Sequence, residues 1–121
     1  MHKEIEIILK TGDKISCDIE ISPLVKWLNS LDNVLTYASC QGDIVNGIHA
    51  YVHFSVSDNY SNLVYILKEL SVYYYRENVV VEVGYNPVIP QRNPILKYTL
   101  YIKNIKTFKS IMDFIKSTGD K

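Results

Sequence analysis

Five residues with different chemistry follow one another between two predicted strands: Ser39, Cys40, Gln41, Gly42 and Asp43. Their side chains offer a hydroxyl, a thiol, an amide and a carboxylate, and consecutive backbone N–H groups around a glycine can form an anion-binding nest. Such a set suits a ribose or a phosphate. The same residues also suit a plain turn, in which Gly42 supplies conformational freedom, Cys40 packs inward and Asp43 is solvated. Both interpretations stay open.

A second segment, residues 84–94, combines three prolines with side chains that recognise nucleotides. Prolines stiffen the backbone and remove hydrogen-bond donors. Tyr85 can stack on a base, Asn86 and Asn93 can read amide-like edges, and Arg92 can hold a phosphate. Loops of this length in compact domains are often functional. The segment therefore suits a lid over a ligand; the alternatives are an interface arm and a simple hairpin connection.

On the strand predicted over 48–56, polar residues alternate with apolar ones: His49, Tyr51 and His53 against Ala50, Val52 and Phe54. Side chains alternate between the two faces of a strand, so the apolar set should face the helices and the other set the open side. The two histidines would lie roughly 13 Å apart and could not share a metal ion. The two cysteines, Cys17 and Cys40, have no spacing typical of a zinc site. We therefore expect no metal site.

A catalytic role would fall on Cys40 as nucleophile, with His49 or His53 as its base. In a hairpin closed around residues 43–47, Cys40 lies opposite roughly residue 50, which leaves His53 too far away and His49 on an undetermined face. The chain also has no phosphate-cradling Gly-x-x-x-x-Gly-Lys and no His-Glu-x-x-His motif. The sequence therefore favours a binding protein over an enzyme, with no catalytic residue and no cofactor assigned.

The elements that must position these groups follow a strand–strand–helix order that occurs three times. Hydrophobic alternation predicts strands over 4–9, 14–21, 34–39, 48–56, 79–85 and 95–103. Apolar residues at helical spacing predict helices that begin at 22–23, that follow 57–59, and that cover 105–115 and end before Gly119. We expect an α+β fold in which a mixed sheet carries three helices mainly on one face, with a ferredoxin-like βαββαβ core.

The composition of the 121 residues predicts one domain, residues 1–121, that buries a core without staples. Lys+Arg and Asp+Glu are both 13, so the net charge is zero and long nucleic acids are disfavoured as partners. The first residues do not resemble a signal peptide, and no apolar run approaches the ~20 residues that span a bilayer. We expect a cytoplasmic protein with free thiols and no membrane partner. The ten tyrosines, three of them at 73–75, suit a homodimer interface or amphipathic packing, and we expect a homodimer.

The segment 36–53 resembles the Ser-Ser-Cys-Ser-Gly loop of the wybutosine-synthesis tRNA methyltransferase family. In that family a Thr-rich strand precedes the loop and a strand ending near a histidine follows it, and the counterparts here are Thr36, Ser39, Cys40, Gly42 and His53. Gln41 stands where the family has a serine, and Asp43 stands where a basic residue usually follows the glycine. The resemblance implies binding of S-adenosylmethionine and tRNA.

The size, the Lys-, Asn- and Ile-rich composition and the loop-carrying α+β layout are similar to those of small phage and prophage proteins. Among these are the Thoeris anti-defence proteins. That resemblance implies that the chain sequesters a cyclic ADP-ribose-type immune signal in the host cytoplasm without cleaving it.

We therefore expect non-enzymatic binding and sequestration of a nucleotide-derived small molecule. The predicted binding residues come from the 39–43 segment, the 48–56 strand and the 84–94 loop: Ser39, Cys40, Gln41, Gly42, Asp43, His53, Tyr85, Asn86, Arg92 and Asn93. One alternative is a protein like the S-adenosylmethionine-dependent tRNA-modifying enzymes. Another is a protein–protein inhibitor that binds through its tyrosines and the Val88-Ile89 tip.

Overall fold

The computed structural model describes residues 2–57, 61–74, 79–86 and 95–119, and for 71–74, 84–86, 95–96 and 118–119 it describes the backbone alone. Within these ranges the strand–strand–helix order occurs three times, which confirms the predicted α+β class. The elements are β1 (Glu4–Ile8), β2 (Lys14–Asp18), α1 (Ser22–Ser30), β3 (Val34–Cys40), β4 (Ala50–Val56), α2 (Ser61–Tyr74), β5 (Val79–Asn86), β6 (Ile95–Ile102) and α3 (Ile105–Gly119).

The described strands form two antiparallel sheets rather than the one mixed sheet that we expected. β1 pairs with β2, and the other four strands follow the order β3-β4-β6-β5. A ferredoxin-like core would place β2 between β4 and β5, but β6 occupies that position, so this detail of the prediction is not confirmed. The eight residues of β6 can pair along both neighbours, whereas β2 has only five.

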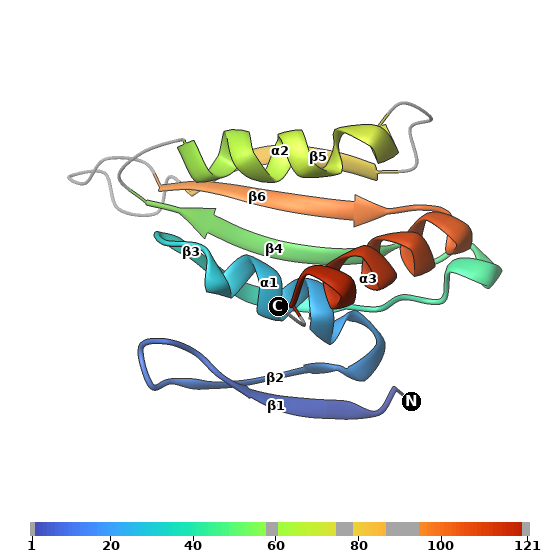
Figure 1. The fold of residues 1–121 in the computed structure, drawn as a ribbon, viewed down its shortest axis with the longest axis horizontal. Coiled ribbons are helices and arrows are strands. Elements are labelled where there is room, and N and C mark those ends of the chain that lie inside the picture. The colour runs from blue at the N-terminus through green and yellow to red at the C-terminus, as the bar shows by residue number, and fades with distance from the viewer. Residues whose placement is uncertain (1, 58–60, 75–78, 87–94, 120–121) are drawn as a thin grey trace.

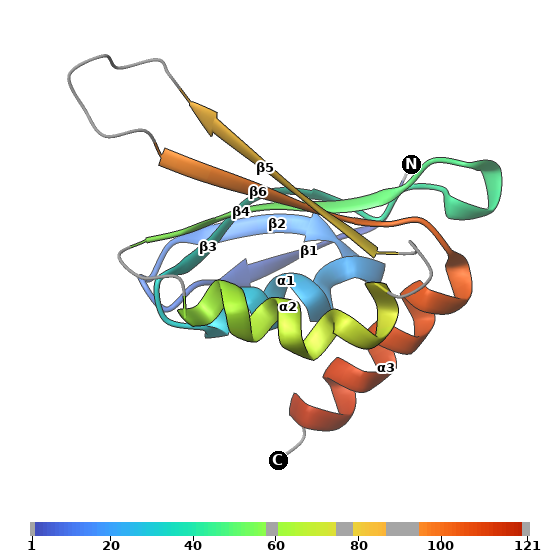
Figure 2. The same ribbon diagram turned by 90° about the horizontal axis from the view of Figure 1, so that it is seen from above.

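All three helices lie on one side of the strand layer, and no described element covers the other side (Figures 1 and 2). The β1–β2 hairpin lies beside β3, at the end of the layer opposite β5 (Figure 1). No backbone hydrogen bond joins β2 to β3, although both strands are fully described. We call the line between these two strands the seam.

The hydrophobic core lies between the helices and the strands and draws side chains from all three strand–strand–helix units. Ala50, Val52 and Phe54 of β4 are completely buried, as the alternation in the sequence predicts. Each large apolar side chain buried in this way contributes roughly 1.5–3 kcal/mol relative to exposure. Other fully buried members include Ile21, Leu24, Leu28, Val34, Ile66, Leu70, Leu100, Ile102 and Ile111.

The first helix begins differently from the prediction. The strand ends at Asp18, and a short 3-10 turn over Ile19–Ile21 replaces the last part of the strand expected over 14–21. Ser22 is not a side-chain N-cap, because its hydroxyl donates a hydrogen bond back to the Ile19 carbonyl at 2.8 Å. Pro23 does occupy the first turn, as expected. At the other end of the chain α3 runs through Gly119, so the expectation that the helix ends before this glycine is wrong.

Asn29 joins α1 to β3 from inside the core, where only 6% of its surface is exposed. Its amide nitrogen donates hydrogen bonds to the Val25 carbonyl at 2.9 Å and to Thr36 Oγ1 at 2.8 Å. Its amide oxygen accepts a hydrogen bond from the Thr36 backbone N–H at 3.0 Å. These bonds satisfy polar groups that burial would otherwise leave unpaired.

The substitution Asn29→Ala should lower the free energy of unfolding by about 1–3 kcal/mol, because it leaves the buried Thr36 N–H and hydroxyl without their partner. Urea denaturation followed by circular dichroism measures the change. Asn46→Ala is the matched control, because Asn46 is exposed and its side chain bonds only to the Asp43 carboxylate at the surface; the control should stay within ~0.5 kcal/mol of the wild type. Equal stability of the two variants would contradict this role of Asn29.

Candidate functional site

The side of the four-stranded sheet away from the helices carries a regular array of polar and aromatic residues. Directly opposite residues in an antiparallel pair lie on the same face of a sheet, so the register defines rows across the strands. The rows run Cys40–Tyr51–Tyr101–Val80, then Ala38–His53–Thr99–Glu82, then Leu35–Ser55–Lys97–Gly84. Tyr51 and His53 therefore face away from the helices, as the alternation predicts.

A β-bulge brings one further ring to this face. The register shifts between Thr36 and Ala38, so that Tyr37 is the additional residue of β3, with 48% of its surface exposed. The rings of Tyr37 and His53 are stacked, with centroids 5.6 Å apart and planes 14° from parallel. Tyr51 lies 4.9 Å from His53 and 6.5 Å from Tyr101, and both pairs are tilted. We call the surface of Tyr37, Tyr51, His53, Lys97, Thr99 and Tyr101 the aromatic face.

His53 lies at the centre of the aromatic face. Its Nδ1 shares a hydrogen bond of 2.6 Å with Thr99 Oγ1. Partial burial, and then the nearby Lys97 charge, hold the pKa of His53 below its usual value. The Lys97 ammonium also lies over the Tyr37 ring, 4.7 Å from its centroid, a cation–π arrangement. Burial raises the pKa of the Tyr37 hydroxyl, so that hydroxyl keeps its proton at neutral pH.

The predicted 39–43 segment is part strand end and part turn. Ser39 pairs with Val52 and so lies on the helix side, whereas Cys40 pairs with Tyr51 and lies beside the aromatic face. Gly42 has a φ of +67°, and its N–H donates to Cys40 Sγ at 3.3 Å. Asp43 closes the turn through paired backbone hydrogen bonds of 2.9 Å with Ile48. The segment is thus a tight turn whose thiol faces outward.

Gln41 crosses the seam from this turn to the end of β2. Its backbone N–H donates to Asp18 Oδ2 at 2.9 Å, and its side-chain oxygen accepts from the Glu20 N–H at 3.1 Å. Burial alone would raise the pKa of Asp18, but hydrogen bonds from the Gln41 N–H, the His2 ring and the Cys40 thiol together lower it. His2 Nδ1 lies 2.9 Å from Asp18 Oδ2. The sequence analysis assigned no role to His2 or Asp18.

The Cys40–His53 pairing considered for catalysis is replaced by other partners. His53 Nδ1 shares a hydrogen bond with Thr99 Oγ1, and Cys40 Sγ accepts a hydrogen bond from the Gly42 N–H. The histidine that lies near Cys40 is His2. His49 is exposed and precedes the first residue of β4.

Within one chain, the register separates the two segments that were expected to share a ligand. In β5 the row of Cys40 contains Val80, whereas Tyr85 and Asn86 pair with Leu96 and Ile95 at the far end of the sheet. Five residues along a strand correspond to roughly 17 Å. The side chains of Tyr85 and Asn86, and all of Arg92 and Asn93, lie outside the described parts of the structure, as do the side chains of the tyrosines at 73–75.

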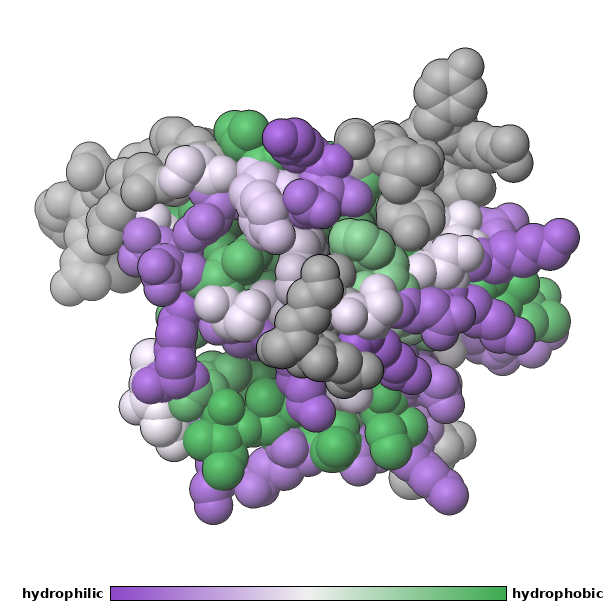
Figure 3. Space-filling view, in the orientation of Figure 1, coloured by the Kyte–Doolittle hydropathy of each residue, from purple (hydrophilic) through white to green (hydrophobic). Residues whose placement is uncertain are grey.

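Cavities also open elsewhere in the described parts of the structure. A cleft of about 800 Å³ on the helix side is lined by Trp27 and Leu31 of the first unit, Tyr65 of α2 and Phe114 and Lys116 of α3, among others. A smaller cavity of about 230 Å³ lies between the 41–45 turn and the start of α3. Figure 3 shows the helix side, where hydrophilic residues are widespread and hydrophobic ones gather over the β1–β2 hairpin.

No family model, no curated protein and no solved structure matches this chain. The resemblances to the wybutosine-synthesis family and to the Thoeris anti-defence proteins therefore stay predictions. Among the described residues, none of the helices is long and apolar enough to cross a bilayer. Cys17 and Cys40 are both free, as expected.

The substitution Gly42→Ala should destabilise the turn, because a Cβ at this position would lie 2.6 Å from the carbonyl oxygens of Ile48 and His49. Gly47→Ala is the control, since Gly47 has a similar φ of +85° but nothing within 4 Å of its Cβ position. Gly42→Ala should therefore lower the free energy of unfolding by roughly 1–3 kcal/mol more than Gly47→Ala. Denaturant titrations of the two variants measure the difference, and a difference near zero would contradict the close approach.

The lowered pKa of His53 predicts a loss of stability in mild acid. Because the unfolded chain takes up this proton at a higher pH than the folded chain, the contribution of His53 to stability is constant above the unfolded pKa of about 6.5 and decreases as the pH falls toward the folded value. Unfolding free energies measured between pH 8 and pH 5 should decrease less for His53→Gln than for the wild type. His49→Gln, at an exposed histidine, should follow the wild-type curve, and a superimposable His53→Gln curve would refute the assignment.

Proposed function

We propose that the protein binds a nucleotide-derived small molecule whose base stacks on the aromatic face. The observation that carries the proposal is the line of rings Tyr37–His53–Tyr51–Tyr101 on an uncovered sheet face, with neighbouring centroids 4.9–6.5 Å apart. Single-stranded bases are commonly recognised on sheet faces of this kind, where aromatic side chains stack on them. Each base stacked in this way contributes roughly 1–3 kcal/mol of binding free energy.

The polar groups among the rings suit the rest of a nucleotide. The Lys97 ammonium lies over the Tyr37 ring, where it can contact a phosphate, and the Thr99 hydroxyl lies in the row between His53 and Glu82. Glu82, in the same row as Thr99, can accept hydrogen bonds from a ribose hydroxyl. A cation and a carboxylate on one face match a small ligand with both phosphate and hydroxyl groups.

The dimensions and charge of the surface favour a small molecule over a long nucleic acid. Three rows across four strands cover roughly 14 Å in each direction, the size of a mononucleotide or dinucleotide. The net charge of zero gives no general attraction for a polyphosphate backbone. The proposed action is sequestration: the ligand is held by stacking and released unchanged. A cyclic ADP-ribose-type signal, the ligand implied by the resemblance to anti-defence proteins, is the first compound to test.

The substitution Tyr37→Ala should weaken binding of cyclic ADP-ribose, ADP-ribose or AMP by roughly 5- to 150-fold, because it removes one stacking surface. Isothermal titration calorimetry against each of the three compounds measures the dissociation constants. Tyr37→Phe keeps the ring and should bind like the wild type. Mass spectrometry of the ligand recovered after denaturation should return it intact; a cleaved product would overturn sequestration.

Tyr65→Ala is the matched control for Tyr37→Ala, because it removes a tyrosine ring from the opposite side of the molecule. Tyr65 is similarly exposed, at 41%, but lines the helix-side cleft together with Trp27. Tyr65→Ala should leave nucleotide binding unchanged. If Tyr65→Ala abolishes binding while Tyr37→Ala does not, the ligand occupies the helix-side cleft and the proposal is wrong. If none of the three compounds binds the wild type and a protein co-purifies with it, the inhibitor alternative is favoured.

A further inference from the structure

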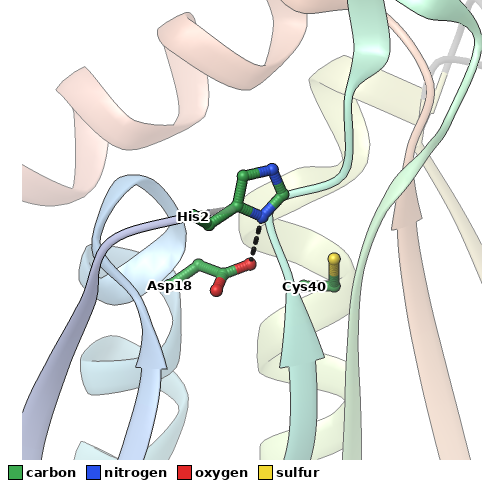
Figure 4. A group of neighbouring side chains, drawn as sticks. All are labelled: His2, Asp18 and Cys40. Atoms are coloured by element: carbon green, nitrogen blue, oxygen red, sulfur yellow. Dashed lines mark hydrogen bonds and ion pairs between the residues drawn. The ribbon is translucent and has the colours of Figure 1, made fainter.

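Three side chains with metal-binding atoms meet at the seam, and they come from three separate parts of the chain (Figure 4). His2 precedes β1, Asp18 ends β2 and Cys40 ends β3. One ligand atom from each lies within 4.8 Å of the other two. His2 Nδ1 and Asp18 Oδ2 are 2.9 Å apart, and we call the three residues the seam cluster.

The combination of donors is specific in its chemistry. An imidazole nitrogen, a carboxylate oxygen and a thiolate sulfur are the three ligand types that zinc accepts, with bonds of about 2.0–2.3 Å. A tetrahedral zinc ion with such bonds holds neighbouring donors about 3.3–3.6 Å apart. The ligand atoms of the seam cluster are therefore close to the separation that zinc requires, and side-chain movements of about 1 Å would bring them to it.

Backbone donors already support the anionic form of two of these ligands. The Gly42 N–H donates to Cys40 Sγ at 3.3 Å, and the Gln41 N–H donates to Asp18 Oδ2 at 2.9 Å. Supporting hydrogen bonds of this kind orient the ligands at metal sites and stabilise their charge. These two backbone hydrogen bonds are a second observation, separate from the proximity of the three side chains.

The cluster is also accessible. The His2 and Asp18 side chains are 35% and 13% exposed, so an ion can enter from solvent. A nucleophilic triad would need one ring nitrogen of His2 on the carboxylate and the other on the thiol. In Figure 4 both Asp18 and Cys40 lie on the Nδ1 side of the ring, and the other nitrogen points away from Asp18. The three side chains therefore face a common point between them, as metal ligands do, rather than forming a triad.

We propose that His2, Asp18 and Cys40 bind a zinc-type divalent cation with three protein ligands. The fourth coordination position is left to water or to a ligand on the neighbouring aromatic face, because Cys40 lies directly opposite Tyr51. On binding, the thiol of Cys40 loses its proton to solvent and the sulfur forms the bond to the metal. The site does not depend on the proposed nucleotide binding.

Cobalt(II) is the probe, because a thiolate bound to it gives a charge-transfer absorption band in the near ultraviolet. The full chain should be used in its reduced form, with any purification tag at the carboxyl end and free of histidines. Titration with cobalt(II) should give this band with one ion per chain, and zinc(II) should displace it. Absence of the band in the folded wild type would overturn the proposal.

Paired variants test the individual ligands. Cys40→Ala should abolish the band, whereas Cys17→Ala should keep it, because Cys17 is buried on the helix side of β2. His2→Gln should weaken cobalt binding by at least the roughly 10- to 100-fold that follows loss of a supporting partner, and His49→Gln should not. Circular dichroism confirms that each variant is folded. A band that persists in Cys40→Ala would refute the three-ligand site. Unchanged cobalt affinity in His2→Gln would also refute it, because His2 is exposed and its substitution leaves the core intact.

Discussion

The burial of Ala50, Val52 and Phe54 against the helices is the constraint on which the rest of the molecule depends. These side chains are fully buried, and a slip of one residue in the pairing of β4 would move them to solvent and bring Tyr51 and His53 into the core. β4 is a central strand, so its orientation is imposed on β3 and β6 through their registers. The aromatic face is therefore the necessary counterpart of the core.

The seam shows a different way of joining strands. β2 and β3 follow each other through α1 and lie side by side without a backbone ladder. Gln41 replaces part of that ladder, since its backbone N–H bonds to the Asp18 carboxylate and its side-chain oxygen accepts from the Glu20 N–H, both at the end of β2. Asn29 connects α1 to β3 on the helix side. Gln41 and Asn29 thus join the first strand–strand–helix unit to β3 of the larger sheet at two separate points.

Patterns local in the chain could be predicted from the sequence. The alternation in β4 predicted which residues face the helices, and the apolar spacing predicted α1, α2 and α3. Local patterns could not predict that β2 pairs with β1 and with no strand of the described four-stranded sheet. The choice of pairing partner depends on energies spread over many contacts between residues distant in the chain. For the same reason the seam cluster escaped notice: His2, Asp18 and Cys40 are far apart in the chain and share no motif spacing. The separation of the 39–43 turn from Tyr85 likewise follows only from strand order.

The bulge at Tyr37 has a consequence for every residue that follows it in β3. Before the bulge, odd-numbered positions such as Leu35 face away from the helices, and after it even-numbered positions such as Ala38 and Cys40 do so. In an unbroken strand Cys40 would point toward the helices, the inward packing that a plain turn implies. The additional residue reverses this parity. A one-residue deletion in β3 would turn the thiol away from Asp18 while leaving the amino acids of the seam cluster unchanged.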